Sequence, residues 1–538
     1  MNKITFITLF AVLQLLLVDT SKAQNAQQIN TQKMAAVLYY IDNFYVDSAN
    51  TSKIVEDAII AALKELDPHS AYISKTDVEK ANEPLIGSFD GIGVTFQLIN
   101  DTITVISPIP DGPSDKVGII AGDKIVYIDD EPSFGKKIDN EYVQKHLRGP
   151  KGSRVKLGIR RGNDKDILDF DVVRDKIPIN SINASFMIND KIGYIKLDRF
   201  AKETITEFTT AMNELIDNNM ESLILDLRGN SGGYLNTAIE LVDQFLDQNK
   251  LIVYTEGEKS RRMEWKSSHR GLFTSGNLAV LIDEGSASAS EIVSGAIQDW
   301  DRGIVIGRRS FGKGLVQRPF ELPDGSIIRL TTARYHTPTG RFIQRPYENG
   351  TEEYYKELTK RLEHGEYFHA DSIQFPDSLL YRTNNGRIVY GGGGIMPDIF
   401  IPIDTSFNSK LYTNIVRKGL LNKLAVDFSM TNRKDLLKTY YSIDKFIDKF
   451  NIDDNMINKL AALAEEEKIE WKNEEYLRSE KYIKLQLKAM IARNLWNTEQ
   501  YYQVVMSEDS AIQKAVSILN DKRYNNLLSE QSPYNNKH

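Results

Sequence analysis

Three glycine-rich segments in the middle of the chain carry side chains that could do chemistry, and each follows a predicted strand. The chain has no cysteine, which excludes a thiol nucleophile, a disulfide framework and iron–sulfur ligation. The candidate chemistry is therefore that of a serine hydroxyl, a lysine amine or a phosphate-binding loop. The three segments are Gly229-Asn230-Ser231-Gly232-Gly233, Gly285-Ser286-Ala287-Ser288-Ala289-Ser290-Glu291 and residues 307–313.

The third segment resembles a nucleotide-binding loop only in part. Gly307, Gly312 and Lys313 fit the G-x-x-x-x-G-K pattern, but Gly314 stands where that loop needs Ser or Thr to hold magnesium. The residues that follow are β-rich and include Pro319, whereas phosphate binding needs the N-terminus of a helix. The segment therefore argues against nucleotide binding.

Ser231 lies in a G-x-S-x-G pattern between a strand and a helix, which is the setting of a nucleophile elbow. A classical triad would need Asp and then His downstream, and no motif marks any of the five histidines that follow. The backbone N–H groups of such a turn can instead bind an anion, including a reaction oxyanion. Both interpretations stay open from these residues alone.

The serines of residues 285–291 open a predicted helix after the strand Leu278–Ile282. A hydroxyl at a helix N-terminus faces the positive end of the helix dipole, which stabilises developing negative charge. Serine is also an ordinary N-cap residue, and this motif alone favours the capping role over the catalytic one.

Lys313 is the candidate base for a serine nucleophile, which needs a proton acceptor. Burial lowers the pKa of a lysine because desolvation disfavours the ammonium, so activity should rise with pH. Gln317 lies four residues later, and in a strand it would face the same side and orient the amine. The alternative is a solvated surface lysine, the commoner fate of this residue type.

The N-terminus is typical of a signal peptide, with Lys3, an apolar run from Ile4 to Val18 and a cleavage site after Ala23. The sequence therefore predicts an exported protein, periplasmic and either soluble or peripheral to the membrane. The net charge of −7 argues against nucleic acid as a partner. We expect neither a metal nor a cofactor.

The other elements predict a multidomain α/β (α+β) chain of 538 residues. Helical patterns fill residues 24–85, and short strands between glycines predict a small domain over residues 86–175. Strand and helix alternate over residues 176–405, which indicates an α/β core. Residues 406–538 are polar and helical, and are interpreted as a cap or a dimer arm without chemistry of its own.

Together these residues resemble the carboxyl-terminal processing peptidases, the tail-specific proteases of serine peptidase family S41. The resemblance spans about residues 60–405 and includes a PDZ domain inserted before the peptidase core. It rests on the motifs 66–70, 226–233, 285–291, 311–317 and 394–398, and for the PDZ domain on 91–94, 121–125 and 147–152.

The resemblance implies a role for each matching residue. The family's 25-residue interval between nucleophile and base ends at Lys313, and it selects Ser288 over the neighbouring serines. Lys313 takes the place of the general base and Gln317 that of the group that orients it. The oxyanion donors are then the N–H of Ala289 and an N–H of Gly232 or Gly233.

The PDZ resemblance implies that protein substrates are recognised by their C-terminal tails. The peptide carboxylate would bind the N–H groups of Gly91, Ile92, Gly93 and Val94. An activator or adaptor protein and a homodimer through the helical termini are further expected partners. Two departures from the family pattern are Ser231, where a proline is common, and the helix start at residues 113–118.

Two other functions stay open. The chain could be a catalytically inactive scaffold that carries a PDZ domain, or a serine hydrolase that uses Ser231. The first is separated from a peptidase by an assay for protein degradation, and the second by comparing alanine variants of the two serines.

Overall fold

The computed structural model describes residues 28–99, 101–135, 138–162, 166–268, 271–373 and 376–529. The predicted signal peptide and residues 530–538 lie outside these ranges. No helix within the described ranges is both long and apolar enough to cross a membrane. The chain divides into two compact units, of which residues 1–75 with 319–330 form the first and the remainder the second.

The first unit is mainly helical, with helical residues 28–44 followed by α2 (Thr51–Lys64). The region predicted as helical also contains a strand, β1 (Ala71–Ile73), which pairs antiparallel with residues 327–329. The helix ends because Asp67 folds the chain into a turn, in which its Oδ1 accepts hydrogen bonds of 2.8 Å from the N–H groups of His69 and Ser70.

A six-stranded sheet forms the centre of the second unit, in the order β10-β11-β12-β15-β16-β21. β10 is antiparallel to β11, and the other neighbours are parallel. The helices that connect the parallel strands are α6 (Thr204–Asp217), α7 (Leu235–Asp243) and α8 (Ala289–Asp299). The strands are β10 (Ile182–Met187), β11 (Ile192–Leu197), β12 (Ser222–Asp226), β15 (Asn277–Ile282), β16 (Ile304–Gly307) and β21 (Ile399–Phe400).

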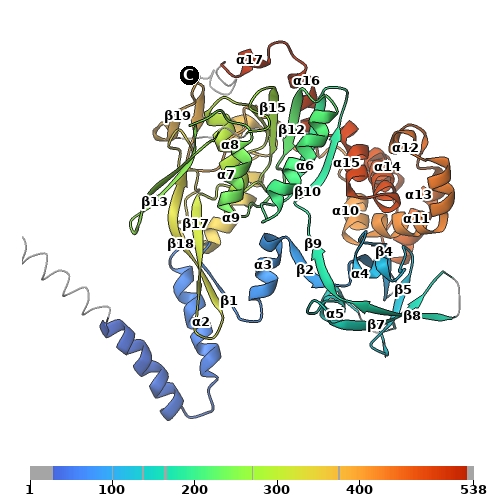
Figure 1. Cartoon of the computed structure of the whole chain (residues 1–538), viewed down its shortest axis with the longest axis horizontal. Helices are drawn as coiled ribbons and strands as arrows, with labels where there is room; N and C mark the ends of the chain where they lie inside the picture. Colours follow the sequence, from blue (N-terminus) through green and yellow to red (C-terminus); the bar gives the residue numbers. More distant parts are fainter. Residues whose placement is uncertain are drawn as a thin grey trace, which may run out of the picture. The chain divides into compact units, whose positions relative to one another are not determined.

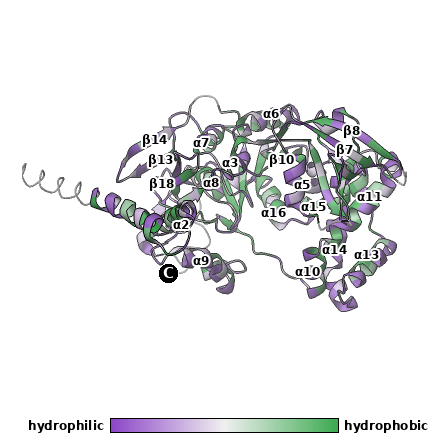
Figure 2. Cartoon of the chain, turned by 90° about the horizontal axis from the view of Figure 1, so that it is seen from below, coloured by the Kyte–Doolittle hydropathy of each residue, from purple (hydrophilic) through white to green (hydrophobic). Residues whose placement is uncertain are grey.

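Both faces of this sheet are buried, which is why its strands are apolar at successive positions rather than alternating. Leu223 and Leu225 of β12 face a core shared with α6, α7 and α8, whereas Ile224 faces a second core. That second core includes α16 (Ser510–Leu519), which lies beside β12 and β15 (Figure 1). The strands near β10 carry mainly the hydrophobic colour in Figure 2.

Several further elements belong to the middle part of the chain. β17 pairs with β18, and β13 pairs with β14 and with residues 334–336 of β18. α9 and the short β19–β20 hairpin follow in the chain. Their bounds are β13 (Leu251–Gly257), β14 (Ser260–Lys266), β17 (Leu315–Glu321), β18 (Ile327–His336), α9 (Thr351–Glu363), β19 (Leu380–Arg382) and β20 (Ile388–Tyr390).

A small β domain precedes the sheet, and it contains the short strands that the sequence predicts within residues 86–175. Its sheet runs in the order β3-β4-β5-β7-β8, with β6 beside β5, and encloses an apolar core with the helix α5. The elements are β3 (Val94–Ile99), β4 (Thr102–Pro108), α4 (Pro113–Lys116), β5 (Lys124–Ile128), β6 (Glu131–Pro132), α5 (Asn140–Leu147), β7 (Arg154–Arg160) and β8 (Ile167–Val173).

Two paired strands lead into and out of the small domain. β2 (Ser88–Gly91) pairs antiparallel with β9 (Asp175–Pro178), and α3 (Val78–Ile86) precedes β2. Arg148, directly after α5, joins the small domain to α3, because its Nη1 pairs with Glu83 Oε2 at 2.6 Å.

The C-terminal region consists of helices, as predicted, but it contributes to two different cores. α10 to α14 enclose a core of their own, whereas α16 and Tyr524 pack on the central sheet. The helices are α10 (Lys410–Arg417), α11 (Leu420–Thr439), α12 (Ile443–Lys449), α13 (Asp454–Glu466), α14 (Asn473–Leu495), α15 (Thr498–Val505), α16 and α17 (Tyr524–Leu527).

Candidate active site

Ser288 occupies the turn between β15 and α8, directly before the first residue of the helix. Its backbone has φ 55° and ψ −111°, outside the conformations that residues with a side chain prefer. Such strain persists only where the surroundings impose it, and it is common at functional sites. Ser231 is not among the described non-glycine residues with positive φ, so it lacks this feature of a nucleophile elbow.

The two serines that flank Ser288 have structural roles. Ser286 and Ser290 are both fully buried. The Ser286 hydroxyl donates to the carbonyl of Leu227 at 2.9 Å, and the Ser290 hydroxyl donates to the carbonyl of Asn230 at 2.8 Å. Both hydroxyls therefore fasten the turn to the neighbouring glycine-rich loop, while Ser288 remains partly exposed.

That loop, residues 227–233 after β12, approaches Ser288 so closely that it leaves no room for a side chain at Gly232. A Cβ atom there would lie 2.8 Å from the carbonyl oxygen of Ala287 and 2.9 Å from the N atom of Ala289. Gly232 also has φ 99°, a region that favours glycine. The glycine-rich loop and the Ser288 turn therefore pack directly against each other.

Asn230 holds the glycine-rich loop in shape from within. Its Oδ1 accepts a hydrogen bond of 2.9 Å from the Gly232 N–H, and its Nδ2 donates to the carbonyl of Leu197 at 3.0 Å. Its own carbonyl accepts from the N–H of Ala287 at 3.0 Å. The Gly232 N–H is thus engaged within the loop, which bears on the choice between Gly232 and Gly233 as oxyanion donor.

Lys313 lies in the segment between β16 and β17, two residues before the strand begins. The argument that spacing within one strand aligns Lys313 with Gln317 therefore does not apply. The glycines on either side allow close packing, since a Cβ on Gly312 would lie 3.1 Å from the backbone of Gly394 and one on Gly314 2.9 Å from the N atom of Gln344. Lys313 is partly exposed.

Glu291 joins the Ser288 turn to the Lys313 segment. Its Oε2 accepts from the N–H of Ser288 at 2.8 Å and from the N–H of Lys313 at 2.9 Å. Its Oε1 accepts from Ser310 Oγ at 2.5 Å and from the N–H of Gly312 at 2.7 Å. Burial raises the pKa of Glu291, and these four hydrogen bonds oppose the rise because they stabilise the carboxylate.

Tyr335 of β18 connects the same two residues from the other side. Its hydroxyl contacts the carbonyl oxygen of Lys313 at 2.6 Å and that of Ser288 at 3.1 Å. Burial, together with the nearby Glu291 carboxylate, raises the pKa of Tyr335 far above its ordinary value, so the hydroxyl stays protonated and able to donate. Ser288 and Lys313 therefore share two buried partners.

Gln317 lies within β17, and its side chain is held by a residue of the paired strand. Its Nε2 donates to Thr331 Oγ1 at 3.2 Å. The Gln317 side chain is partly exposed, as is Lys313 four residues earlier in the chain.

A buried ionic network supports the base of the glycine-rich loop. Burial alone would raise the pKa of Asp226, but the adjacent cations Arg228 and Lys196 hold it at about 2. Arg228 pairs with Asp226 Oδ2 at 2.6 Å, and Tyr194 donates to the same oxygen at 2.8 Å. Lys196 also donates to the carbonyl of Arg228. The last residue of β12 and the start of the loop are thereby fixed together.

The residues predicted to bind a peptide carboxylate lie together in the small β domain. Ile92 is buried, Gly93 has φ 71° and Val94 begins β3. Ser114 of α4 holds this loop, because its hydroxyl and its N–H both donate to the carbonyl of Ile92, at 2.7 and 3.0 Å. β3 is the terminal strand in its sheet order. An extended peptide could pair with its second edge.

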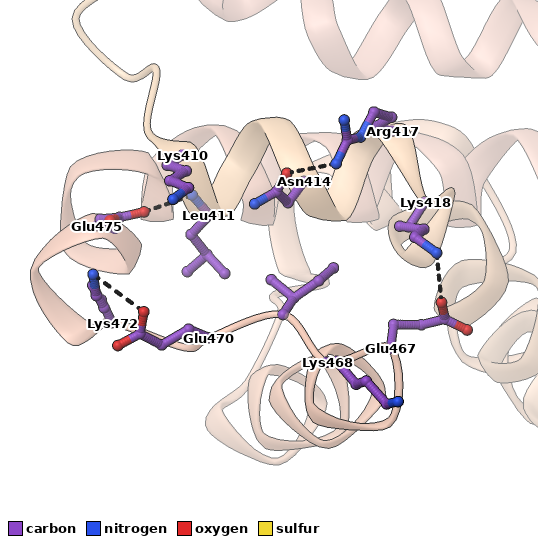
Figure 3. A pocket seen from close by; sticks show the side chains of 11 residues that line it. Lys410, Leu411, Asn414, Arg417, Lys418, Glu467, Lys468, Glu470, Lys472 and Glu475 are labelled. Atoms are coloured by element: carbon purple, nitrogen blue, oxygen red, sulfur yellow. Dashed lines mark hydrogen bonds and ion pairs between the residues drawn. The ribbon is translucent and has the colours of Figure 1, made fainter.

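A separate pocket of about 290 Å³ lies in the C-terminal helical region, between α10 and the α13–α14 connection (Figure 3). Its charged rim pairs internally: Lys418 contacts Glu467 at 3.0 Å and Lys472 contacts Glu470 at 3.2 Å. Glu475 accepts from the N–H of Leu411 at 2.6 Å. These pairs stabilise the helical region without assigning a ligand to the pocket.

Sequence reasoning missed the contributions of Glu291 and Tyr335. For Glu291 a signal existed, because Ser288-x-x-Glu291 has the spacing of a helix capping box. That pattern predicts the hydrogen bond to the Ser288 N–H but not those to the Lys313 segment. Tyr335 carries no local signal, since its role depends on where β18 passes.

Comparison with protein families supports the division seen in the fold. Residues 191–353 match the model of peptidase family S41, and residues 91–172 match that of the PDZ domain. Residues 411–497, which cover α10 to α14, match a family of unknown function.

Individual proteases are similar to this chain over most of their own length. A carboxy-terminal-processing protease of Bartonella bacilliformis is 37% identical over 345 residues, which cover 62% of this chain and 78% of the relative. The carboxy-terminal processing protease CtpB of Bacillus subtilis is 32% identical over 372 residues, covering 68% and 75%. The solved photosystem II D1 C-terminal processing protease is 28% identical, with 56% and 81% covered and a TM-score of 0.34.

Proposed function

Because the chain belongs to peptidase family S41 and carries a PDZ domain, we propose that it is an exported serine endopeptidase that uses a Ser288–Lys313 dyad. The observation that carries this proposal is the shared environment of the two residues. Glu291 accepts a hydrogen bond from the N–H of each, and the Tyr335 hydroxyl contacts the carbonyl of each. The two segments are thus fixed against each other at their backbones.

In the proposed reaction, Lys313 takes the proton of Ser288 as the hydroxyl oxygen attacks the carbonyl carbon of a peptide bond. The lysine then passes that proton to the leaving amine. Water attacks the resulting acyl-enzyme, again with Lys313 as base, and releases the second product. Gln317 is proposed to orient the Lys313 amine, and Thr331 fixes the Gln317 amide at 3.2 Å.

The oxyanion of the tetrahedral intermediate would bind the N–H groups of Ala289 and Gly233. Ala289 is the first residue of α8, so its N–H lies at the N-terminal end of the helix, where the helix dipole is positive. Gly233 is preferred to Gly232, because the Gly232 N–H already donates to Asn230 Oδ1. Donors of this kind each contribute about 10²–10³ in rate.

Substrate choice is proposed to depend on the PDZ domain. The carboxylate of an unstructured C-terminal tail would bind at residues 91–94, and the tail would pair with the edge of β3. This favours proteins with accessible tails over tightly folded ones. Residues 1–23 are proposed to direct the chain to the periplasm, which would place such substrates in that compartment.

Three variants of the full chain test the nucleophile in a casein degradation assay. Ser288→Ala should abolish cleavage but retain binding of a peptide with a free C-terminal carboxylate. Ser231→Ala should retain cleavage, and Lys313→Ala should abolish it. If Ser231→Ala abolished cleavage and Ser288→Ala did not, Ser231 would be the nucleophile. An inactive wild-type chain that still bound tails would instead indicate a scaffold.

A further inference from the structure

The C-terminal segment is part of the peptidase core rather than an appendage. Ile512 and Ala515 of α16 pack on the central sheet, on the face opposite α8. Beyond α16, the Tyr524 hydroxyl exchanges two hydrogen bonds with the backbone of Leu278 in β15, at 2.9 and 2.8 Å. Glu499 of α15 accepts from the N–H of Ser185 in β10 at 3.0 Å.

Within this segment, Asp509 contacts the glycine-rich loop through Arg228. Arg228 Nη1 donates to Asp509 Oδ2 at 2.9 Å and to Oδ1 at 3.1 Å. The Nε and Nη2 atoms of the same guanidinium donate to Asp226. Asp509 and Asp226 therefore hold the planar guanidinium between them, which fixes its direction as well as its position.

The charges in this cluster balance only when Asp509 is counted. Two cations, Arg228 and Lys196, lie beside Asp226, and Lys196 Nζ is 3.8 Å from Asp226 Oδ1. Asp509 supplies the second negative charge. Without it, Arg228 would lose the acceptor for Nη1 and the buried cluster would carry a net positive charge, which favours a different arrangement of the loop.

Arg228 stands immediately before the residues that shape the proposed oxyanion site. Gly229 donates to Asp283 Oδ1 at 2.8 Å, and Asn230 bonds to both Gly232 and Ala287. A shift of the Arg228 backbone would therefore be transmitted along a short chain of hydrogen bonds to Gly232 and, through the backbone, to the adjoining Gly233. A displacement of a donor N–H by less than the length of a covalent bond is enough to weaken its hydrogen bond to the oxyanion.

We propose that Asp509 is a positioning residue for the oxyanion loop, acting through Arg228. This inference rests on the proposed function, since it assumes that residues 232–233 bind the reaction oxyanion. It gives the last part of the chain a role in the reaction, although it lies more than 150 residues beyond the matched peptidase region.

Asp509 also caps α16, and the two roles can be separated. Its Oδ1 accepts from the N–H groups of Ala511 and Ile512, both at 3.0 Å. Asparagine is as good an N-cap as aspartate but carries no charge for Arg228. Asp509→Asn therefore removes the ion pair and keeps the cap. Asp453→Asn is the matched control, because Asp453 caps α13 through the N–H of Met456 at 2.9 Å.

The test measures kcat and KM for a tailed peptide in the full chain, the affinity for a peptide aldehyde, and the thermal midpoint. The Ser288 hydroxyl adds to the aldehyde carbonyl and forms a hemiacetal, whose oxygen atom occupies the proposed oxyanion site. Asp509→Asn should lower kcat about tenfold and weaken aldehyde binding in parallel, with KM within about twofold. Asp509→Glu should recover part of the loss, and Asp453→Asn should leave all four values near wild type.

Unchanged kcat in folded Asp509→Asn would overturn the inference. So would a loss of kcat that follows only a lower thermal midpoint, with aldehyde binding unaffected, because that would be a purely structural role. Neither result touches the proposed nucleophile, which fails separately if Ser288→Ala retains cleavage.

Discussion

At the scale of single residues, the candidate site is organised by side chains that take no direct part in the proposed reaction. Glu291 is fully buried and accepts four hydrogen bonds from the two segments that carry Ser288 and Lys313. The backbone of Ser288 is strained, and its N–H donates to the Glu291 carboxylate at 2.8 Å. Burial of the Glu291 carboxylate lowers the stability of the fold, but its hydrogen bonds fix the relative geometry of the Ser288 and Lys313 segments.

Glu291→Gln should therefore reduce activity more than its small change in shape suggests. The amide keeps one acceptor oxygen, so at least one pair of donors, either those at Oε1 or those at Oε2, loses its partner. Each unsatisfied buried donor costs roughly 1–3 kcal/mol. We expect kcat to fall about 10²-fold and the free energy of unfolding to fall by about 2 kcal/mol.

Steady-state kinetics and urea unfolding check this expectation. Glu264→Gln is a control, because Glu264 lies in the exposed β13–β14 hairpin and pairs with Arg262 at 2.9 Å. Activity of Glu291→Gln equal to that of the control would contradict the assigned role.

The lowered pKa of Asp226 predicts how the free energy of unfolding changes with pH in the acidic range. Its folded pKa of about 2 lies below the ordinary value of 3.8. Its stabilising contribution is therefore complete above about pH 4 and is lost as the pH falls toward 2, by roughly 2 kcal/mol in total. The difference in unfolding free energy between wild type and Asp226→Asn should narrow over this range.

Urea unfolding at pH 4.5 and pH 2.5 measures that difference. Asp130→Asn serves for comparison, because the Asp130 side chain is 79% exposed and exposed ion pairs contribute little to stability. A gap between wild type and Asp226→Asn that stays constant between the two pH values would show that Asp226 titrates normally.

At the scale of elements, the sequence predicts well wherever the pattern is local. The strand Ser222–Asp226 lies in the predicted α/β core and the helix Asn140–Leu147 in the predicted small domain, because burial of every strand residue and the Asp139 N-cap mark them clearly. Lys313 shows the limit. The Lys313 segment is β-rich in sequence, yet it lies before β17. Gly312 packs against the backbone of Gly394 and Gly314 packs against Gln344, and both partners are distant along the chain.

The fit between the glycine-rich loop and α8 gives a prediction at this scale. Gly232→Ala would place a methyl group 2.8 Å from the Ala287 carbonyl and force the loop away from Ser288. Gly229→Ala has a similar positive φ, at 70°, but meets nothing within 4 Å. Both variants pay for backbone strain, of order 1 kcal/mol, and only Gly232→Ala adds the collision.

We expect Gly232→Ala to lose about 10²-fold in kcat and Gly229→Ala to lose far less. Peptide cleavage assays on the two folded variants, with thermal midpoints measured beside them, make the comparison. Equal losses would mean that strain within the loop, and not its approach to Ser288, limits activity.

At the scale of the whole molecule, the C-terminal region, which the sequence predicts as a cap or a dimer arm, contributes to two separate cores. α10 to α14 do enclose their own core, but α16 completes the second face of the peptidase sheet. Sequence patterns show that α16 is amphipathic without showing which surface it covers. The pairing of Arg228 with Asp509 spans 281 residues of chain, a separation that no local pattern encodes.

Because α16 packs on the peptidase sheet, a cavity between α16 and the sheet should lower both the stability of the sheet and the temperature at which peptidase activity is lost. Ile512 is 3% exposed and packs on the sheet, so Ile512→Ala should cost about 3 kcal/mol. Leu477→Ala, in α14, removes a side chain that is 58% exposed and should cost about 0.5 kcal/mol or less. Loss of peptidase activity on heating should shift downward for Ile512→Ala, together with the unfolding transition of the sheet. An independent C-terminal domain would instead unfold in a transition of its own and leave the temperature of inactivation unchanged, which would contradict a shared core.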